Sequence, residues 1–142
     1  MTGGGAGAYV VDERVRVEGN DDVEIIARAG GARFRGGTEV RGKEPILVRT
    51  GGSLTLTGPL VVEGIAAEGY APTWCFLQKK AFLTVVDVVF RDNNGGNAGG
   101  VLALAKNSFA RLNRVVFVNN NALGTGGGVH LKEGATLPGT AR

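Results

Sequence analysis

The feature that most constrains this sequence is a motif that occurs twice at a fixed distance. The stretch FRDNNGGNAGG begins at Phe90, and FVNNNALGTGG begins at Phe117. Each stretch holds a phenylalanine, an asparagine run and a glycine pair in the same order. A period of about 20 to 50 residues is typical of proteins built from stacked supersecondary units. The repeat therefore predicts a stacked architecture.

The repeat extends over most of the chain. The shift that places Phe90 on Phe117 superimposes three copies without a gap, and a slightly longer shift, Ile46 on Cys75, adds the copy before them. The apolar positions that coincide are Ile46, Cys75, Leu102 and Val129; Val48, Leu77, Leu104 and Leu131; Leu54, Leu83, Ala110 and Leu137; and Phe90 and Phe117. A fainter and shorter copy lies between Val23 and Gly36.

Each copy has the pattern of short strands. Apolar and polar residues alternate over a few positions, with valine, leucine and phenylalanine prominent. The chain has 25 glycines, and glycine and asparagine interrupt the pattern too often for long helices. We expect ILVRTGGSLTLTGPLVV to break at Gly51-Gly52 and Gly58-Pro59. In VLALAKNSFARLNRVVF we expect corners at Lys106-Asn107 and Asn113-Arg114.

These features predict an all-β parallel β-helix of about four to five coils, with 22–29 residues in each. Equivalent strands would pair about 4.8 Å apart, and their inward side chains would stack from coil to coil. We assign residues 23–137 to the coils, 1–22 to a cap or flexible lead-in, and 138–142 to a tail that truncates the solenoid. An open last coil predicts end-to-end self-association.

Other repeat architectures fit less well. A leucine-rich repeat requires LxxLxLxxN, which is missing, and a calcium-binding β-roll requires an aspartate after its glycine pairs. A β-sandwich would not produce three copies without gaps.

Two tetrapeptides carry a family resemblance. FRDN (90–93) and FVNN (117–120) match FxxN, while GGVL (99–102) and GGVH (127–130) are similar to a GGA-plus-aliphatic element. Their alternation resembles the repeats of polymorphic outer-membrane proteins of the chlamydial type. The resemblance implies a right-handed parallel β-helix of pectin-lyase-like architecture. For a longer parent protein, it also implies a cell-surface or extracellular location and adhesion.

The repeated polar residues have a structural interpretation. Phe90 and Phe117 are expected to fill the interior, and the glycine pairs are expected to form tight entries to the next strand. Stacked asparagine amides can hydrogen-bond along a column of strands, and asparagine tolerates left-handed backbone. We therefore predict a corner ladder from the asparagines. The polar repeat positions are Asn93, Asn94, Gly99, Gly100, Asn120, Asn121, Gly126 and Gly127.

Candidate catalytic groups are sparse. The repeats hold few acids, and Asp87 aligns with Arg114, so no row of carboxylates forms for general acid and base work or for a metal. The lone Cys75 is expected to be buried and inert, and His130 to face outward, with no acid or serine beside it in the sequence. We assign no catalytic, cofactor or metal residue. The chain is interpreted as a non-enzymatic structural or surface-interaction scaffold; the alternative is a domain that binds or cleaves polysaccharides.

Charge and hydropathy restrict the partners. The net charge is +3 and the pI is about 9.4, but no dense basic run with aromatic residues points to nucleic acid. No apolar stretch approaches the roughly 18 residues of a membrane span. The first residues, MTGGGAGAYVV, have no signal-peptide pattern. Glycans or another protein surface remain as the expected partners.

Overall fold

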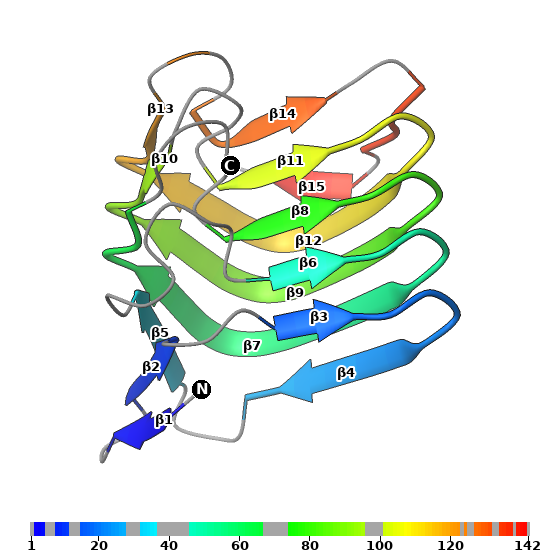
Figure 1. Cartoon of the computed structure of the whole chain (residues 1–142). Coiled ribbons are helices and arrows are strands. Elements are labelled where there is room, and N and C mark those ends of the chain that lie inside the picture. Colours follow the sequence, from blue (N-terminus) through cyan, green and yellow to red (C-terminus); the bar gives the residue numbers. More distant parts are fainter. Residues whose placement is uncertain are drawn as a thin grey trace.

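The chain folds into β-strands (Figure 1). The computed structural model describes residues 2–4, 8–11, 15–27, 32–36, 46–66, 74–95, 101–122, 124, 127–131, 134–137 and 139–141. Within these residues every regular element is a strand, and all pairs of strands are parallel except β1 (Thr2–Gly4) with β2 (Ala8–Val11). The predicted all-β class with parallel pairing is confirmed.

A sheet of short strands forms one wall of the molecule. Its order is β14-β11-β8-β6-β3, so that strands distant in the sequence are neighbours (Figure 1). The strands are β3 (Val15–Val17), β6 (Ile46–Val48), β8 (Cys75–Leu77), β11 (Leu102–Leu104) and β14 (Val129–Leu131). The register places Ile46, Cys75, Leu102 and Val129 in one row, as the superposition of the sequence copies predicted.

The second sheet contains the long strands, in the order β1-β2-β5-β7-β9-β12-β15 with β4 also paired to β7. Its remaining members are β4 (Asp22–Ile26), β5 (Ala32–Gly36), β7 (Ser53–Glu63), β9 (Phe82–Arg91), β12 (Phe109–Val118) and β15 (Gly139–Ala141). A small third sheet pairs β10 (Asn94–Gly95) with β13 (Asn121–Ala122).

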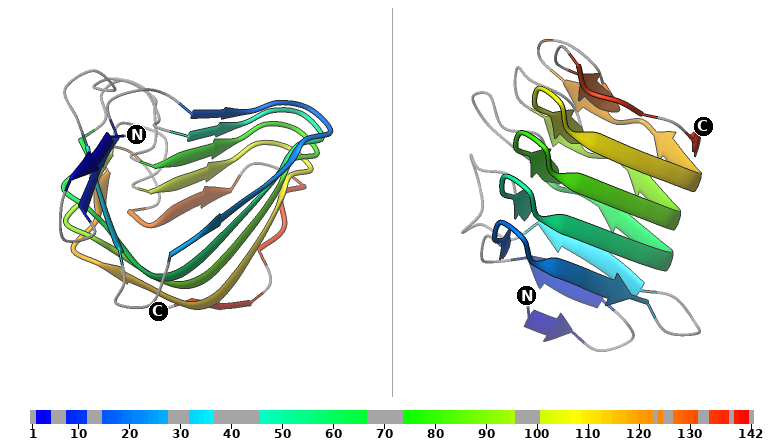
Figure 2. Two further views of the ribbon diagram at one scale, coloured as in Figure 1. Left: turned by 90° about the horizontal axis from the view of Figure 1, so that it is seen from below. Right: turned by 90° about the vertical axis from the view of Figure 1, so that its right-hand side faces the viewer.

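One short strand and the long strand that follows it form a repeat. The five repeats of the described chain begin at β3, β6, β8, β11 and β14, and we number them in that order. Figure 2 shows these repeats stacked one on another. Strand pairing also includes residues outside the predicted range 23–137, because β3 pairs with β6 and β15 with β12.

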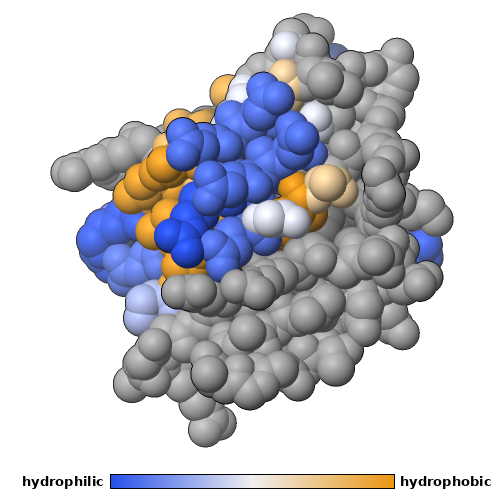
Figure 3. All heavy atoms as spheres, turned by 90° about the vertical axis from the view of Figure 1, so that its left-hand side faces the viewer, coloured by the Kyte–Doolittle hydropathy of each residue, from blue (hydrophilic) through white to orange (hydrophobic). Residues whose placement is uncertain are grey.

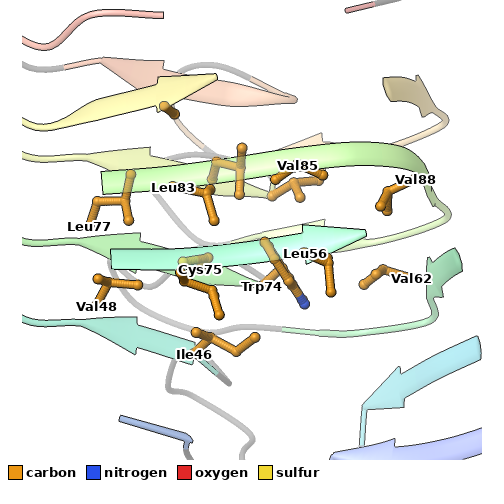
Figure 4. Close-up of a cluster of buried hydrophobic side chains, with 14 of the residues drawn as sticks. Ile46, Val48, Leu56, Val62, Trp74, Cys75, Leu77, Leu83, Val85 and Val88 are labelled. Carbon is orange, nitrogen blue, oxygen red and sulfur yellow. The ribbon is translucent and has the colours of Figure 1, made fainter. Parts of the chain in front are cut away.

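The core lies between the two main sheets. Alternate residues of β7 are buried, and the same alternation occurs in β9, because successive side chains of a strand point to opposite faces. Figure 4 shows side chains from both sheets pointing into this interior. Trp74 fills the largest volume, with its ring centroid 5.1 Å from that of Phe90. Its indole N–H has no hydrogen-bond partner among the described residues, so Trp74 contributes through packing.

Left-handed residues form the corner between the short and the long strand of each repeat. Asn20, Gly51, Lys80, Asn107 and Gly134 occupy equivalent places there and all have positive φ, between 59° and 80°. These corners lie above one another in Figure 2 (right). Glycine and asparagine adopt this conformation at low cost, and they occupy four of these five corners.

Close approach of the backbone also requires glycine after the corner of the second repeat, at Gly52. A Cβ atom on Gly52 would lie 2.7 Å from the carbonyl oxygen of Glu18 in the previous repeat. Only a residue without a side chain can follow the corner at this point.

The predicted breaks at Gly58-Pro59 and Asn113-Arg114 are wrong as strand ends. β7 and β12 continue through them, so each complete repeat has one long strand where two short ones were expected. In β9 and β12 a single left-handed residue bends the chain without ending the pairing on either side. In β7 the pair Gly58-Pro59 lies opposite the single residue Asp87 of β9, as a bulge that the pairing continues past. Arg114 (φ 52°) and its equivalent Asp87 (φ 57°) are these bend residues.

Replacing Leu83 by alanine should lower the free energy of unfolding by about 2–5 kcal/mol, because a fully buried side chain would leave a cavity. The matched control is Thr84→Ala, on the next residue and the outward face, which should change it by less than about 1 kcal/mol. Urea unfolding followed by circular dichroism measures both. Equal effects would contradict the assignment of the two faces.

Candidate functional site

The polar repeat residues gather where β9 and β12 end. The residues before Asn93 and Asn120 have left-handed backbone, with φ 54° at Asp92 and 52° at Asn119. This turns the chain out of the large sheet and into β10 or β13. The asparagines of the two repeats thus lie one above the other, because β10 and β13 pair in register, Asn94 with Asn121. We call Asn93, Asn94, Asn120 and Asn121 the asparagine corner.

Asn93 is the centre of this corner, and it is only 1% exposed. Its Oδ1 accepts a hydrogen bond from the backbone N–H of Ile65 at 3.1 Å, and its Nδ2 donates to the carbonyl oxygen of Val62, also at 3.1 Å. Both groups belong to the previous repeat. The side chain therefore satisfies buried backbone groups that a turn would otherwise leave without partners.

Asn120 makes the same connection one repeat later. Its Nδ2 donates to the carbonyl oxygen of Phe90 at 2.8 Å, and its Oδ1 accepts from the backbone N–H of Asn93 at 3.2 Å. The same Oδ1 also accepts from Nδ2 of Asn93 at 2.9 Å. The two side chains therefore form a continuous hydrogen-bonded column across three repeats.

Asn94 and Asn121 lie on the surface beside this column. Both are exposed, and Nδ2 of Asn121 donates to Oδ1 of Asn94 at 3.3 Å. Figure 3 views the molecule from this side and shows hydrophilic residues gathered there, with hydrophobic residues beside them. Exposed amides joined to each other offer donors and acceptors to solvent but no titratable group.

Aromatic rings support the corner from inside. Phe90 is fully buried, and its ring lies on that of Phe117 with centroids 5.3 Å apart and planes at 13°. Gly127 also belongs to this region, since a Cβ there would lie 3.2 Å from the carbonyl oxygen of Asn120. Gly99, Gly100 and Gly126, predicted as tight entries, lie outside the described residues.

The sequence analysis did not identify Val62 and Ile65, whose backbone carbonyl and N–H are the hydrogen-bond partners of the Asn93 side chain. A shift of 28 residues places Val62 at Phe90 and Ile65 at Asn93, which is the register observed. That shift could have found them. However, Val62 aligns with a phenylalanine and Ile65 with an asparagine, so no identical residue indicates this alignment in the sequence.

The cysteine and the histidine of the sequence analysis do not form a catalytic arrangement with other described residues. Cys75 is fully buried, and burial raises the pKa of its thiol far above the ordinary value, so it stays protonated. His130 is half-buried in the row of Leu47, Phe76 and Ala103.

Among the described residues no group of three histidine, cysteine, aspartate or glutamate side chains is placed to hold a metal ion. No helix that could cross a membrane occurs in that part of the chain.

Ion pairs on the surface also join neighbouring repeats. Nε of Arg91 lies 2.7 Å from Oε2 of Glu63, and Nη2 of Arg114 lies 3.0 Å from Oδ2 of Asp87. The hydrogen bond from Arg114, together with its charge, lowers the pKa of Asp87 below the ordinary 3.8. The carboxylate is thus held ionised by its partner, which is the opposite of a group prepared to donate a proton.

Comparisons with known proteins give no match: no family model, no curated protein and no solved structure is similar to the chain. The resemblance of its tetrapeptides to polymorphic outer-membrane repeats therefore stays a prediction.

Removing the Asn93 side chain should lower the free energy of unfolding by about 2–4 kcal/mol, because the N–H of Ile65 and the carbonyl of Val62 would be buried without partners. Asn94→Ala, on the adjacent exposed residue, should change it by less than about 0.5 kcal/mol. Chemical denaturation of both variants is the measurement. Similar small losses in both would show that the column contributes nothing.

The Asp87–Arg114 pair should give a defined pH dependence. Because the pKa of Asp87 is lowered on folding, its stabilising contribution is present above pH 3.8 and is lost as the pH falls through the lower, folded-state value. An NMR titration should show the Asp87 carboxyl titrating below 3.8 in the native protein and nearer 3.8 in Arg114→Gln. Arg111→Gln removes an exposed arginine that forms no ion pair with the described acids, and it should leave the titration unchanged.

Proposed function

We propose that this chain is a segment of a right-handed parallel β-helix and acts as a non-enzymatic scaffold for structure or surface interaction. The support for the helix is that both main sheets pair by the same shift along the sequence. Cys75 lies beside Leu102 in the sheet of short strands, and Leu83 lies beside Ala110 in the sheet of long strands, at the same sequence separation. Each repeat is then one coil, and its long strand bends around a shared interior.

One observation carries the function: the recurrent polar side chains are used between repeats. The amides of Asn93 and Asn120 bind backbone groups of the repeat before them. The ion pair of Glu63 with Arg91 likewise joins two neighbouring repeats. An active site needs polar groups that converge on a free reacting position, whereas these groups are already engaged with each other.

The ends of the stack favour a longer solenoid in which further coils continue the pattern. Leu131 in the fifth repeat is 45% exposed, although its equivalents Leu77 and Leu104 are fully buried. In the first repeat the inward residues Val23 and Ile25 are only partly buried, although their equivalents Leu54 and Leu56 are fully buried. Apolar side chains at both ends are what another coil would cover. By the resemblance in its tetrapeptides, the parent protein would be displayed at a cell surface and take part in adhesion.

The alternative, a domain that binds polysaccharides, is favoured by a separate observation. Phe82 is 52% exposed, and its ring centroid lies 5.9 Å from that of Phe109 on the outward face of the large sheet. Exposed aromatic pairs are a common component of ligand-binding surfaces.

A screen of acidic and neutral polysaccharides separates the two functions, with turnover and binding measured in parallel. The scaffold should give no turnover of any polymer. Turnover that disappears in Asp87→Ala or Asp92→Ala, but not in the exposed control Asp21→Ala, would overturn the proposal. Binding without turnover that is lost in Phe82→Ala would establish the alternative.

A further inference from the structure

Charges of opposite sign are separated along one outward face of the molecule. This face, which we call the polarised face, consists of the corners between short and long strands and the outward residues of β4 and of the first halves of β7, β9 and β12. At its first-repeat end, Asp21, Asp22 and Glu24 are all exposed. Asp22 accepts a hydrogen bond from Oγ of Ser53 at 2.6 Å, and Asp21 and Glu24 point to solvent.

The other end of the polarised face is basic. Lys79 and Lys80 lie at the corner of the third repeat, and Lys106 and Arg111 belong to the fourth. All four side chains are exposed, and none of them forms an ion pair with an acidic residue in the described part of the chain. At the corner of the second repeat, by contrast, Arg49 is paired with Glu18 of the first repeat.

Between the two ends the face is less polar. The outward row of Asp22, Ser53, Phe82 and Phe109 runs through four successive strands. Phe82 is 52% exposed. An exposed apolar centre between charged ends has the anatomy of a protein interface, in which a dry core is surrounded by a polar rim.

Distance prevents the two ends from neutralising each other. Asp22 and Phe109 are three strand spacings apart, which is roughly 14 Å at about 4.8 Å per spacing. The Debye length at 0.1 M ionic strength is about 10 Å. The acids of the first repeat and the bases of the fourth therefore act as separate patches, each able to attract an opposite charge from outside the chain. The third repeat, with Lys79 and Lys80, is two spacings from the first, roughly 10 Å.

We propose that two copies of this chain pair through their polarised faces, with the order of their repeats running in opposite directions. A twofold axis parallel to the strands, between β7 and β9, places β4 of each copy over β12 of the other, and β7 over β9. Glu24 and Asp21 then meet Arg111 and Lys106 of the second copy twice, once at each end. The two Phe82 rings lie next to the axis, where they are removed from water.

A second copy fits this face better than a polyanion does. Two identical faces related by a twofold axis are self-complementary only if each carries both signs of charge at separated places, which is the arrangement observed. A nucleic acid or an acidic polysaccharide lying along the same face would use the basic end and be repelled by Asp21 and Glu24. The acidic end has a role in the dimer alone.

Two charge reversals test the pairing. The acid-reversed variant carries Asp21→Lys and Glu24→Lys, and the base-reversed variant carries Lys106→Glu and Arg111→Glu. Sedimentation velocity over a range of protein concentrations should show a dimer for the wild type that weakens as salt is added. Each variant alone should dissociate at least about tenfold more readily, because like charges then face each other. An equimolar mixture of the two should restore the dimer.

The control is Asp92→Lys, a reversal of charge at the asparagine corner, which should leave dimerisation unchanged. Phe82→Ser gives an independent measurement and should weaken the dimer without altering charge; circular dichroism checks that each variant is folded. A wild type that stays monomeric, or a mixture that does not restore the dimer, overturns the proposal. The proposal is also overturned if the protein is a monomer that binds heparin through Lys106 and Arg111 and the acid-reversed variant binds heparin more tightly.

Discussion

Parallel pairing of equivalent strands, repeat on repeat, is the interaction on which the rest of this structure depends. The central strands have their backbone groups paired to the strand one repeat before and one repeat after them, in register. That register places Leu54, Leu83 and Ala110 in one buried row. No repeat has enough apolar surface to form a core alone, so packing and pairing are the same event. A one-residue slip would turn every inward side chain outward.

Corners are the weak points of such a stack, because a chain that turns leaves backbone groups unpaired. Two solutions occur here. Left-handed residues turn the chain within one residue at equivalent places, and the amides of Asn93 and Asn120 take the backbone partners that the sheets cannot supply. The asparagines that most resemble a ligand site in the sequence therefore use their side-chain amides to bind the preceding repeat. What is left for partners is the outward face, where charge is unpaired and Phe82 is exposed.

The period, the strand class and the register could be predicted from the sequence, because they follow from the spacing of apolar residues such as Cys75, Leu102 and Val129. The bends could not. Gly58-Pro59 and Asn113-Arg114 have the composition of strand ends, yet pairing continues through them. Local sequence marks where a chain can turn, but hydrogen bonds from both neighbouring repeats determine whether the turn ends a strand. The burial of Trp74 could not be predicted either, because it is not one of the apolar positions that coincide between the sequence copies.

The sequence by itself determined that equivalent residues would meet, since a repeat without gaps allows one register and that register defines which side chains stack. It also determined the asparagine positions. Only the tertiary structure decided what those asparagines bind, because their partners, Val62 and Ile65, carry no matching side chain and are recognised through their backbone. The tertiary structure also decided that acids of the first repeat and bases of the third and fourth share one face. Distances between charges depend on how strands stack, and residue order alone does not contain them.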